Sequence, residues 1–166
     1  MNRIKKLTTA SVLVAMGVAL SPFSIPLGVA RVFPIQHMIN VIASVLLGPG
    51  YAVGMAFATS LIRNSLGTGT LLAFPGSMLG ALLAGLAAKY MENKLVPVCA
   101  GELIGTGVLG ALAAYPIAAF IMGRDVALFG FVIPFVASSL GGAVIAFVLL
   151  RALKHTGIFQ TYIGGA

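Results

Sequence analysis

Charge is what this sequence has least of: only 8% of its 166 residues are charged, and only 3 are acidic. With 60% hydrophobic residues and a mean hydropathy of +1.10, the chain has too little polar surface for a soluble globular domain. Its single cysteine, Cys99, excludes an intramolecular disulfide framework and a thiolate metal cage. Because the two histidines are far apart and the acidic residues form no cluster, we expect no metal site and no cofactor.

No motif for nucleotide binding or catalysis is present in the sequence. The phosphate-binding pattern G-x-x-x-x-G-K-[ST] is absent, and the glycine-rich residues 67–69 lack the strand and helix that a dinucleotide fingerprint requires. The chain also lacks a His-Glu-x-x-His helix, a nucleophile elbow and paired intramembrane carboxylates. We therefore expect a protein that is not an enzyme and that cannot use ATP by itself.

Long uncharged runs fill most of the chain, and a bilayer-spanning helix needs about 20 mainly apolar residues. Turn signals and charges divide these runs into six expected spans: residues 7–21, 35–47, 51–62, a fourth that ends near 88, 98–122 and 128–150. The second and third are short for a full crossing. The sequence thus predicts an all-α membrane protein, a six-transmembrane-helix bundle formed by one domain over residues 1–166.

The basic residues are distributed unequally between the two sides that six spans create. Seven lie on the side of the termini: Arg3, Lys5, Lys6, Lys89, Lys94, Arg151 and Lys154. Three lie on the opposite side: Arg31, Arg63 and Arg124. Because cytoplasmic loops carry an excess of lysine and arginine, both termini are expected to be cytoplasmic.

Small residues recur at four-residue spacing in most spans. In the first span, Ser11, Ala15 and Ala19 form a flat strip on one helix face, which lets another helix approach closely. We expect this strip to dock against a partner. Four further groups have the same spacing: Gly50, Gly54 and Ala58; Gly76, Gly80 and Ala84; Gly101 and Gly105; Ser138, Gly142 and Ala146. For these groups, close packing inside the bundle is the simpler explanation.

Polar side chains are scarce within the spans, and each is costly enough at membrane depth to need a reason. His37, Asn40 and Ser44 share one face of the second span, where they could bind a small ligand or join helices through hydrogen bonds. Glu102 is the only acidic residue within a span and is a candidate by default. Because Glu102 lies about one turn inside the cytoplasmic end of its span, we rank it below the outer residues as a ligand contact. The alternative is that it braces its own helix around Gly101, Gly105 and Thr106.

Other candidates lie towards the outer ends of the spans. Asn64 closes the third span beside Arg63, whose guanidinium we expect to extend to the membrane surface. Tyr115 precedes Pro116 and could stack on a planar heterocycle while its hydroxyl donates a hydrogen bond. Ser138 could complete a pocket or bond to the carbonyl groups of its own helix.

In its small size, six spans, basic N-terminus and the strip AMGVA at residues 15–19, the chain resembles the substrate-binding S components of energy-coupling factor (ECF) vitamin transporters. The runs NSLGTGTLLAFPGS at 64–77 and GELIGTG at 101–107 are similar to the ThiW branch of that family. That branch is associated with uptake of hydroxyethylthiazole, the thiazole precursor of thiamine.

The resemblance implies a multi-pass capture subunit in the plasma membrane of a prokaryote. It implies that a transmembrane T subunit and two cytoplasmic ATPase subunits supply the energy for import. It further implies that Ser11, Ala15 and Ala19 contact the T subunit, and that the capture subunit topples in the membrane to deliver its ligand. The first outer loop, with Phe23 and Phe33, becomes a gate over the pocket.

A small neutral heterocycle with one hydroxyl needs an apolar pocket, an aromatic platform and a few hydrogen-bond partners. The expected substrate-binding residues are His37, Asn40, Asn64, Tyr115 and Ser138, with Glu102 ranked below them. The sequence shows no concentrated set of charges for a phosphorylated or strongly anionic ligand. It also has no tryptophan, which excludes the indole stacking used by some thiamine-binding relatives. The exact ligand therefore stays open among hydroxyethylthiazole, thiamine and the pyrimidine precursor.

Two other functions stay open at this point. One is a small proton-coupled secondary transporter with Glu102 and His37 as the proton relay. It predicts transport by the isolated protein. The other is a non-transporting assembly subunit held to its partners by the small-residue strips, which predicts no specific small ligand.

Overall fold

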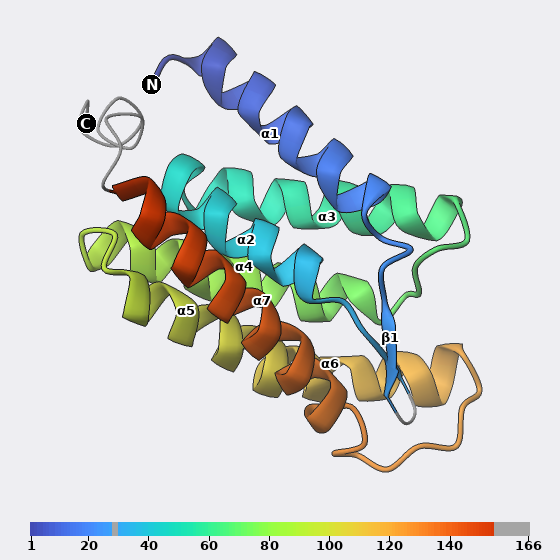
Figure 1. Cartoon of the computed structure of the whole chain (residues 1–166). Helices are drawn as coiled ribbons and strands as arrows, with labels where there is room; N and C mark the ends of the chain where they lie inside the picture. The colour runs from blue at the N-terminus through green and yellow to red at the C-terminus, as the bar shows by residue number, and fades with distance from the viewer. Residues whose placement is uncertain (28–29, 155–166) are drawn as a thin grey trace.

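The computed structural model describes residues 1–27 and 30–154 of the chain, and this part is a helical bundle with one short β-hairpin (Figure 1). The elements are α1 (Arg3–Ala19), β1 (Ile25–Leu27), β2 (Ala30–Val32), α2 (Pro34–Leu47), α3 (Pro49–Ser65), α4 (Ala73–Tyr90), α5 (Leu95–Ile104), η1 (Gly105–Gly110), α6 (Ala111–Pro116), η2 (Ile117–Ile121) and α7 (Val132–Lys154). The segments from α5 to η2 follow one another as a single helix, Leu95–Ile121, in which η1 and η2 are π-helical. The predicted helical class is therefore confirmed.

The bundle has two distinct ends (Figure 1). One end, called the hairpin end below, carries β1, β2, the loop 66–72 between α3 and α4, and the loop 122–131 that leads into α7. The other, the terminus end, carries the start of α1, the last residues of α7, and the tight connections from α2 to α3 and from α4 to α5. The functional residues discussed below lie mainly towards the hairpin end.

Some helices begin or end at a proline or glycine, and there the observed boundaries differ from the expected spans. Gly48, at a φ of 84°, ends α2, and Pro49 occupies the first turn of α3, where its missing N–H costs nothing. As a result α3 is longer than the expected 51–62 and includes Arg63 within the helix. The proline-rich exit from α1 forms the antiparallel hairpin, in which Ile25 pairs with Val32 and Pro26 with Arg31.

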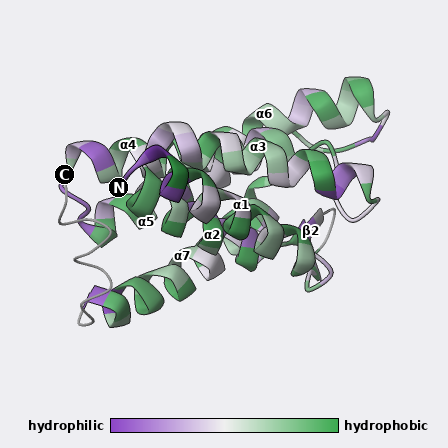
Figure 2. Ribbon diagram, turned by 90° about the horizontal axis from the view of Figure 1, so that it is seen from above, coloured by the Kyte–Doolittle hydropathy of each residue, from purple (hydrophilic) through white to green (hydrophobic). Residues whose placement is uncertain are grey.

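Two described helices are long and apolar enough to cross a bilayer, Leu95–Ile121 and Val132–Lys154, and α2 is a shorter apolar helix. Both long helices expose large apolar side chains, for example Phe120 at 83% and Ile133 at 72%. Figure 2 shows hydrophobic residues along the helices and most of the hydrophilic ones towards the two ends of the bundle. An outer surface this apolar fits a lipid environment better than water.

The small-residue strips of α4 and α5 bring these helices into close contact. A Cβ atom added at Gly101 would lie 2.8 Å from the backbone of Leu83, and one at Gly105 would lie 2.5 Å from the carbonyl oxygen of Leu79. The packing expected for these strips is confirmed. The expectation of close packing is wrong for Gly50 and Gly54 in α3, because a Cβ at either position would meet no described atom within 4 Å.

Candidate functional site

A cavity of about 420 Å³ opens towards the hairpin end of the bundle. The first turns of α2, α4 and α7 form its walls together with η1, the hairpin and the loop 66–72. The residues used below are Arg31, Phe33, Gln36, His37, Thr68, Gly76, Ser77, Thr106, Arg124, Phe135 and Ser138. Its volume lies within the range of about 300–1,000 Å³ that is typical of small-molecule pockets.

A buried pair of ionisable side chains lies at the cavity wall. His37 lines the cavity, and its Nδ1 lies 2.7 Å from Oε1 of Glu102, which is fully buried in α5. The same Oε1 accepts hydrogen bonds from Asn40 Nδ2 at 3.2 Å and from Thr106 Oγ1 at 3.1 Å. One carboxylate oxygen thus ties α2 to the helix that contains α5 and η1.

This contact determines what His37 can offer to a ligand. A carboxylate bonded to one ring nitrogen fixes the orientation of the imidazole and its tautomer. With Nδ1 donating to Glu102, Nε2 of the neutral ring is an acceptor, and in the protonated ring it becomes a second donor. Within residues 1–27 and 30–154, Nε2 has no hydrogen-bond partner. It is the polar atom that His37 leaves available at the cavity.

A glycine in α4 makes room for this arrangement. A Cβ at Gly80 would lie 2.1 Å from Thr106 Oγ1 and 2.7 Å from Glu102 Oε1, so no other residue fits without displacing them. The carbonyl oxygen of Gly76 lies 3.0 Å from Thr106 Oγ1 and shares its single hydroxyl proton with Glu102, and Asn40 donates to Ser77 Oγ at 3.0 Å. Hydrogen bonds to α4 therefore hold both residues that flank the carboxylate.

Arg63 lies behind the cavity wall and is fully buried. Its guanidinium donates to Gln36 Oε1 and, at 3.3 Å, to the carbonyl oxygen of Thr68, and it stacks over the Phe33 ring at 4.1 Å from the centroid. The expectation that Arg63 extends to the membrane surface is wrong. The reason is local, because the loop after α3 folds back over the Arg63 side chain. The N–H groups of Thr68 and Gly69 hold the loop there by donating to the Arg63 carbonyl oxygen.

Three of the residues singled out in the sequence line the cavity: His37, Ser138 and the gate residue Phe33. The Phe33 N–H donates to Ser138 Oγ at 3.0 Å, which ties the end of the hairpin to α7. Asn40 and Glu102 lie directly behind this wall as partners of His37 and of its neighbours. Glu102 thus braces the polar cluster across helices, and not only within its own helix.

The other candidates lie elsewhere. Asn64 donates to the carbonyl oxygens of Ser60 at 2.8 Å and Thr70 at 3.0 Å, so it holds the loop that follows α3. Tyr115 is outside the cavity lining, and Phe23 is 70% exposed. The residues that bring an aromatic ring to the cavity are instead Phe33 and Phe135.

Sequence reasoning missed Thr106, Gln36 and Phe135 as residues of the cavity. Thr106 had a usable signal, because it follows Glu102 by four residues and so shares its helix face. The expectation that charges do not gather at one site is also wrong. Arg31 from the hairpin and Arg124 from the loop before α7 both line the cavity, although nearly a hundred residues separate them.

A second hollow, a groove of about 870 Å³, lies between α1 and α3. Its lining includes Ser11, Ala15 and Ala19 on α1 and the strip Gly50, Gly54 and Ala58 on α3. The two strips face the same groove and leave it open in the described part of the chain. The small-residue strip of α1 therefore has a counterpart on α3 that the sequence did not connect with it.

The family model described as "Thiamine-precursor transporter protein (ThiW)" matches residues 7–156. Because the match extends over most of the 166 residues, this chain belongs to the ThiW family. No curated protein and no solved structure matches it significantly. Together with its apolar helices, the family identifies a membrane protein of thiamine-precursor transport.

Proposed function

We propose that this chain is the substrate-capture subunit of an ECF-type importer and that its cavity binds hydroxyethylthiazole from the outside. In this proposal the chain is one domain that crosses a prokaryotic plasma membrane six times. Both termini are cytoplasmic, as the distribution of lysine and arginine favours. The hairpin end and its cavity then face outwards, where the ligand is captured.

The observation that carries the proposal is the cavity in which Glu102 orients His37. A hydroxyethylthiazole needs an apolar surface for its ring and one hydrogen-bond partner for its hydroxyl. Phe33 and Phe135 supply the aromatic surface, and His37 Nε2 accepts from the ligand hydroxyl. Ser138 lies beside Phe33 and completes the polar wall, while Asn40 acts through the carboxylate.

The energy for import comes from partner subunits in this proposal, because the sequence contains no nucleotide-binding motif. The groove between α1 and α3 is the surface for the T subunit. Ser11, Ala15 and Ala19 let a partner helix approach α1, and Gly54 does the same on α3. Two ATPase subunits bind to the T subunit on the cytoplasmic side.

The gate of the cavity is assigned to Phe33, which forms part of the wall and is held by Ser138 and by the Arg63 guanidinium. Phe23 lies in the segment between α1 and the hairpin and is largely exposed. We assign it to the outer surface of the gate loop, where it meets the membrane interface.

Calorimetric titration of the purified protein in detergent tests the proposal. We expect hydroxyethylthiazole to bind without any partner subunit, and thiamine and the pyrimidine precursor to bind much more weakly. His37→Ala removes the acceptor and is expected to weaken binding by about tenfold or more, the loss typical of a hydrogen bond with a charge-assisted partner. Tyr115→Phe is the matched control, because Tyr115 lies outside the cavity lining. If none of the three compounds bound, hydroxyethylthiazole as the captured ligand would be refuted.

The short His37–Glu102 contact also favours a second candidate, a proton-coupled secondary transporter that uses this pair as a relay. The two functions differ in what the isolated protein does in proteoliposomes. Uptake of hydroxyethylthiazole driven by a pH gradient alone, and abolished by Glu102→Gln, would establish the second candidate. High-affinity binding without uptake until the T and ATPase subunits are added would exclude it.

A further inference from the structure

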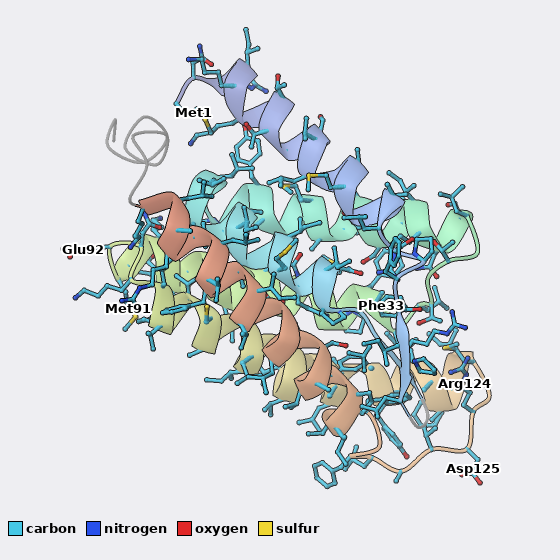
Figure 3. The ribbon with its side chains drawn as sticks, viewed as in Figure 1. Met1, Phe33, Met91, Glu92, Arg124 and Asp125 are labelled. Atoms are coloured by element: carbon cyan, nitrogen blue, oxygen red, sulfur yellow. The ribbon has the colours of Figure 1, made fainter. Side chains whose placement is uncertain are left out.

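The formal charges on the side chains that line the cavity are of one sign. Arg31 and Arg124 line it, and none of the residues that line it is acidic. The described acidic side chains lie elsewhere: Glu102 is paired with His37 behind the wall, and Figure 3 shows Glu92 at the terminus end and Asp125 projecting away from the bundle. Arg31 and Arg124 are exposed, so they lie where the cavity opens, which we call its mouth. No carboxylate in the lining pairs with either guanidinium.

Three helix N-termini point towards the same space. Gln36 and His37 belong to the first turn of α2, Ala73 begins α4, and Phe135 belongs to the first turn of α7. Each helix N-terminus carries roughly half a positive elementary charge. No first turn of α2, α4 or α7 contains an acidic residue, and neither α2 nor α4 has a side-chain cap. Among residues 1–27 and 30–154, the carboxylate found beside these first turns is that of Glu102, and its contact is with the His37 side chain.

The wall behind the cavity holds one buried charge of each sign: the Glu102 carboxylate, which is paired with His37, and the Arg63 guanidinium, which has no acidic partner among the described residues. The Arg63 guanidinium is fully buried, its contacts are with the neutral groups of Gln36, Thr68 and Phe33, and its Nε has no partner in the described part of the chain. Burying a cation without a counter-charge is costly. An anion in the adjacent cavity lowers that cost, since the field of a buried charge is weakly screened.

Beyond the neutral alcohol considered so far, we propose that the cavity is built for a thiamine precursor that carries an anionic group, a phosphate monoester or a carboxylate on the heterocycle. Such a ligand binds in the reverse orientation to the alcohol: its anionic group lies at the mouth between Arg31 and Arg124, and its ring lies deeper against Phe135 and His37. Arginine favours such groups because its planar guanidinium donates two parallel hydrogen bonds to their oxygens. This assignment rests on the proposed capture function and names its substrate more narrowly.

The test compares hydroxyethylthiazole with its phosphate monoester, in calorimetric titrations of the full chain in detergent. We expect the monoester to bind at least about tenfold more tightly at low salt, as one charge-assisted contact provides. Because the arginines at the mouth are exposed, this preference is expected to fall as salt is raised. The double variant Arg31→Gln/Arg124→Gln is expected to lose the preference, and Arg31→Lys/Arg124→Lys to retain most of it. Arg151→Gln, at the terminus end, is the matched control and is expected to keep it.

The possible outcomes separate this inference from the proposed function. If the alcohol binds as tightly as the monoester or more tightly, the anionic substrate is refuted and the capture function stands. If neither compound binds, capture of a thiazole precursor is itself refuted. Inorganic phosphate serves as a third probe: binding as tight as that of the monoester would indicate a general anion site and would also overturn the inference. Thermal unfolding of each variant verifies that it is folded.

Discussion

Replacing Gly80 by alanine tests whether the contact between α4 and α5 holds the polar cluster in place. The added methyl group would lie 2.1 Å from Thr106 Oγ1 and 2.9 Å from Glu102 Cδ, well inside normal contact distance. Neither neighbour can move freely, because Thr106 bonds to Gly76 and Glu102 bonds to His37. We expect the substitution to separate the two helices or to break these hydrogen bonds.

The expected magnitude follows from three contributions. Overpacking costs about 1–3 kcal/mol, and each hydrogen bond that breaks costs about 0.5–1.5 kcal/mol. Replacing a mid-helix glycine by alanine returns about 0.5–1 kcal/mol. With one hydrogen bond broken, the net loss of unfolding free energy for Gly80→Ala is therefore about 0.5–4 kcal/mol, or roughly 1–16 °C in Tm for a chain of this size. Because the imidazole loses its fixed orientation, ligand affinity is expected to fall as well.

Gly54→Ala is the matched control, since it makes the same change in the middle of a helix where a Cβ meets no described atom within 4 Å. Only the helix-propensity gain remains, so Tm should stay constant or rise slightly. A thiol-reactive dye can follow unfolding in detergent, because Cys99 is the single cysteine and is partly buried. Equal Tm and affinity for Gly80→Ala and the unmodified chain would refute the close-contact argument, as would an equal loss in the control.

Three further substitutions probe other parts of the molecule. Glu102→Gln keeps the shape but removes the charge beside His37, and calorimetry should show ligand binding weakened about tenfold, the loss of one charge-assisted hydrogen bond. Arg63→Met removes the cost of a buried cation but leaves the acceptors of Gln36 and Thr68 without their donor; we expect the second effect to be larger, so thermal unfolding should show a net loss of about 1–3 kcal/mol. Exposed Arg151→Met should change the unfolding free energy by less than about 0.5 kcal/mol. Ala15→Leu adds bulk to the groove between α1 and α3 and should abolish co-purification with the proposed T subunit while ligand affinity stays unchanged. Retained co-purification would count against the coupling surface.

The helices and the buried face of α2 could be predicted from the sequence because their signals are local. Apolar run length and turn residues identify the helices. The three-residue and four-residue steps from His37 to Asn40 and Ser44 place all three on one helix face, and all three are buried. The alternative of interhelical hydrogen bonds holds for all three, since His37 bonds to Glu102, Asn40 to Ser77 and Ser44 to the carbonyl oxygen of Ala81. His37 in addition lines the cavity.

The role of Glu102 and the burial of Arg63 could not be predicted, because both depend on contacts between distant segments. The sequence places Glu102 near one end of its own helix. It does not show which residues of α2 lie at the same depth in the bundle. His37 comes from the first turn of α2, at the opposite end of the bundle from the start of α5, and still reaches Glu102. Arg63 is covered by a loop whose return path is set by two backbone hydrogen bonds.

The small-residue strips show most clearly why a motif alone does not determine its structural role. In α4, Gly80 faces Gly105 and Gly76 faces Gly110, so glycine meets glycine and the backbones come within contact distance. Gly50 and Gly54 in α3 have the same spacing, but α1 lies too far away to fill the space beside them. A strip that the fold fills contributes to stability, and a strip that the fold leaves open is available to a partner. Alanine at Gly80 should therefore affect stability and ligand binding, whereas bulk at Ala15 should affect only assembly.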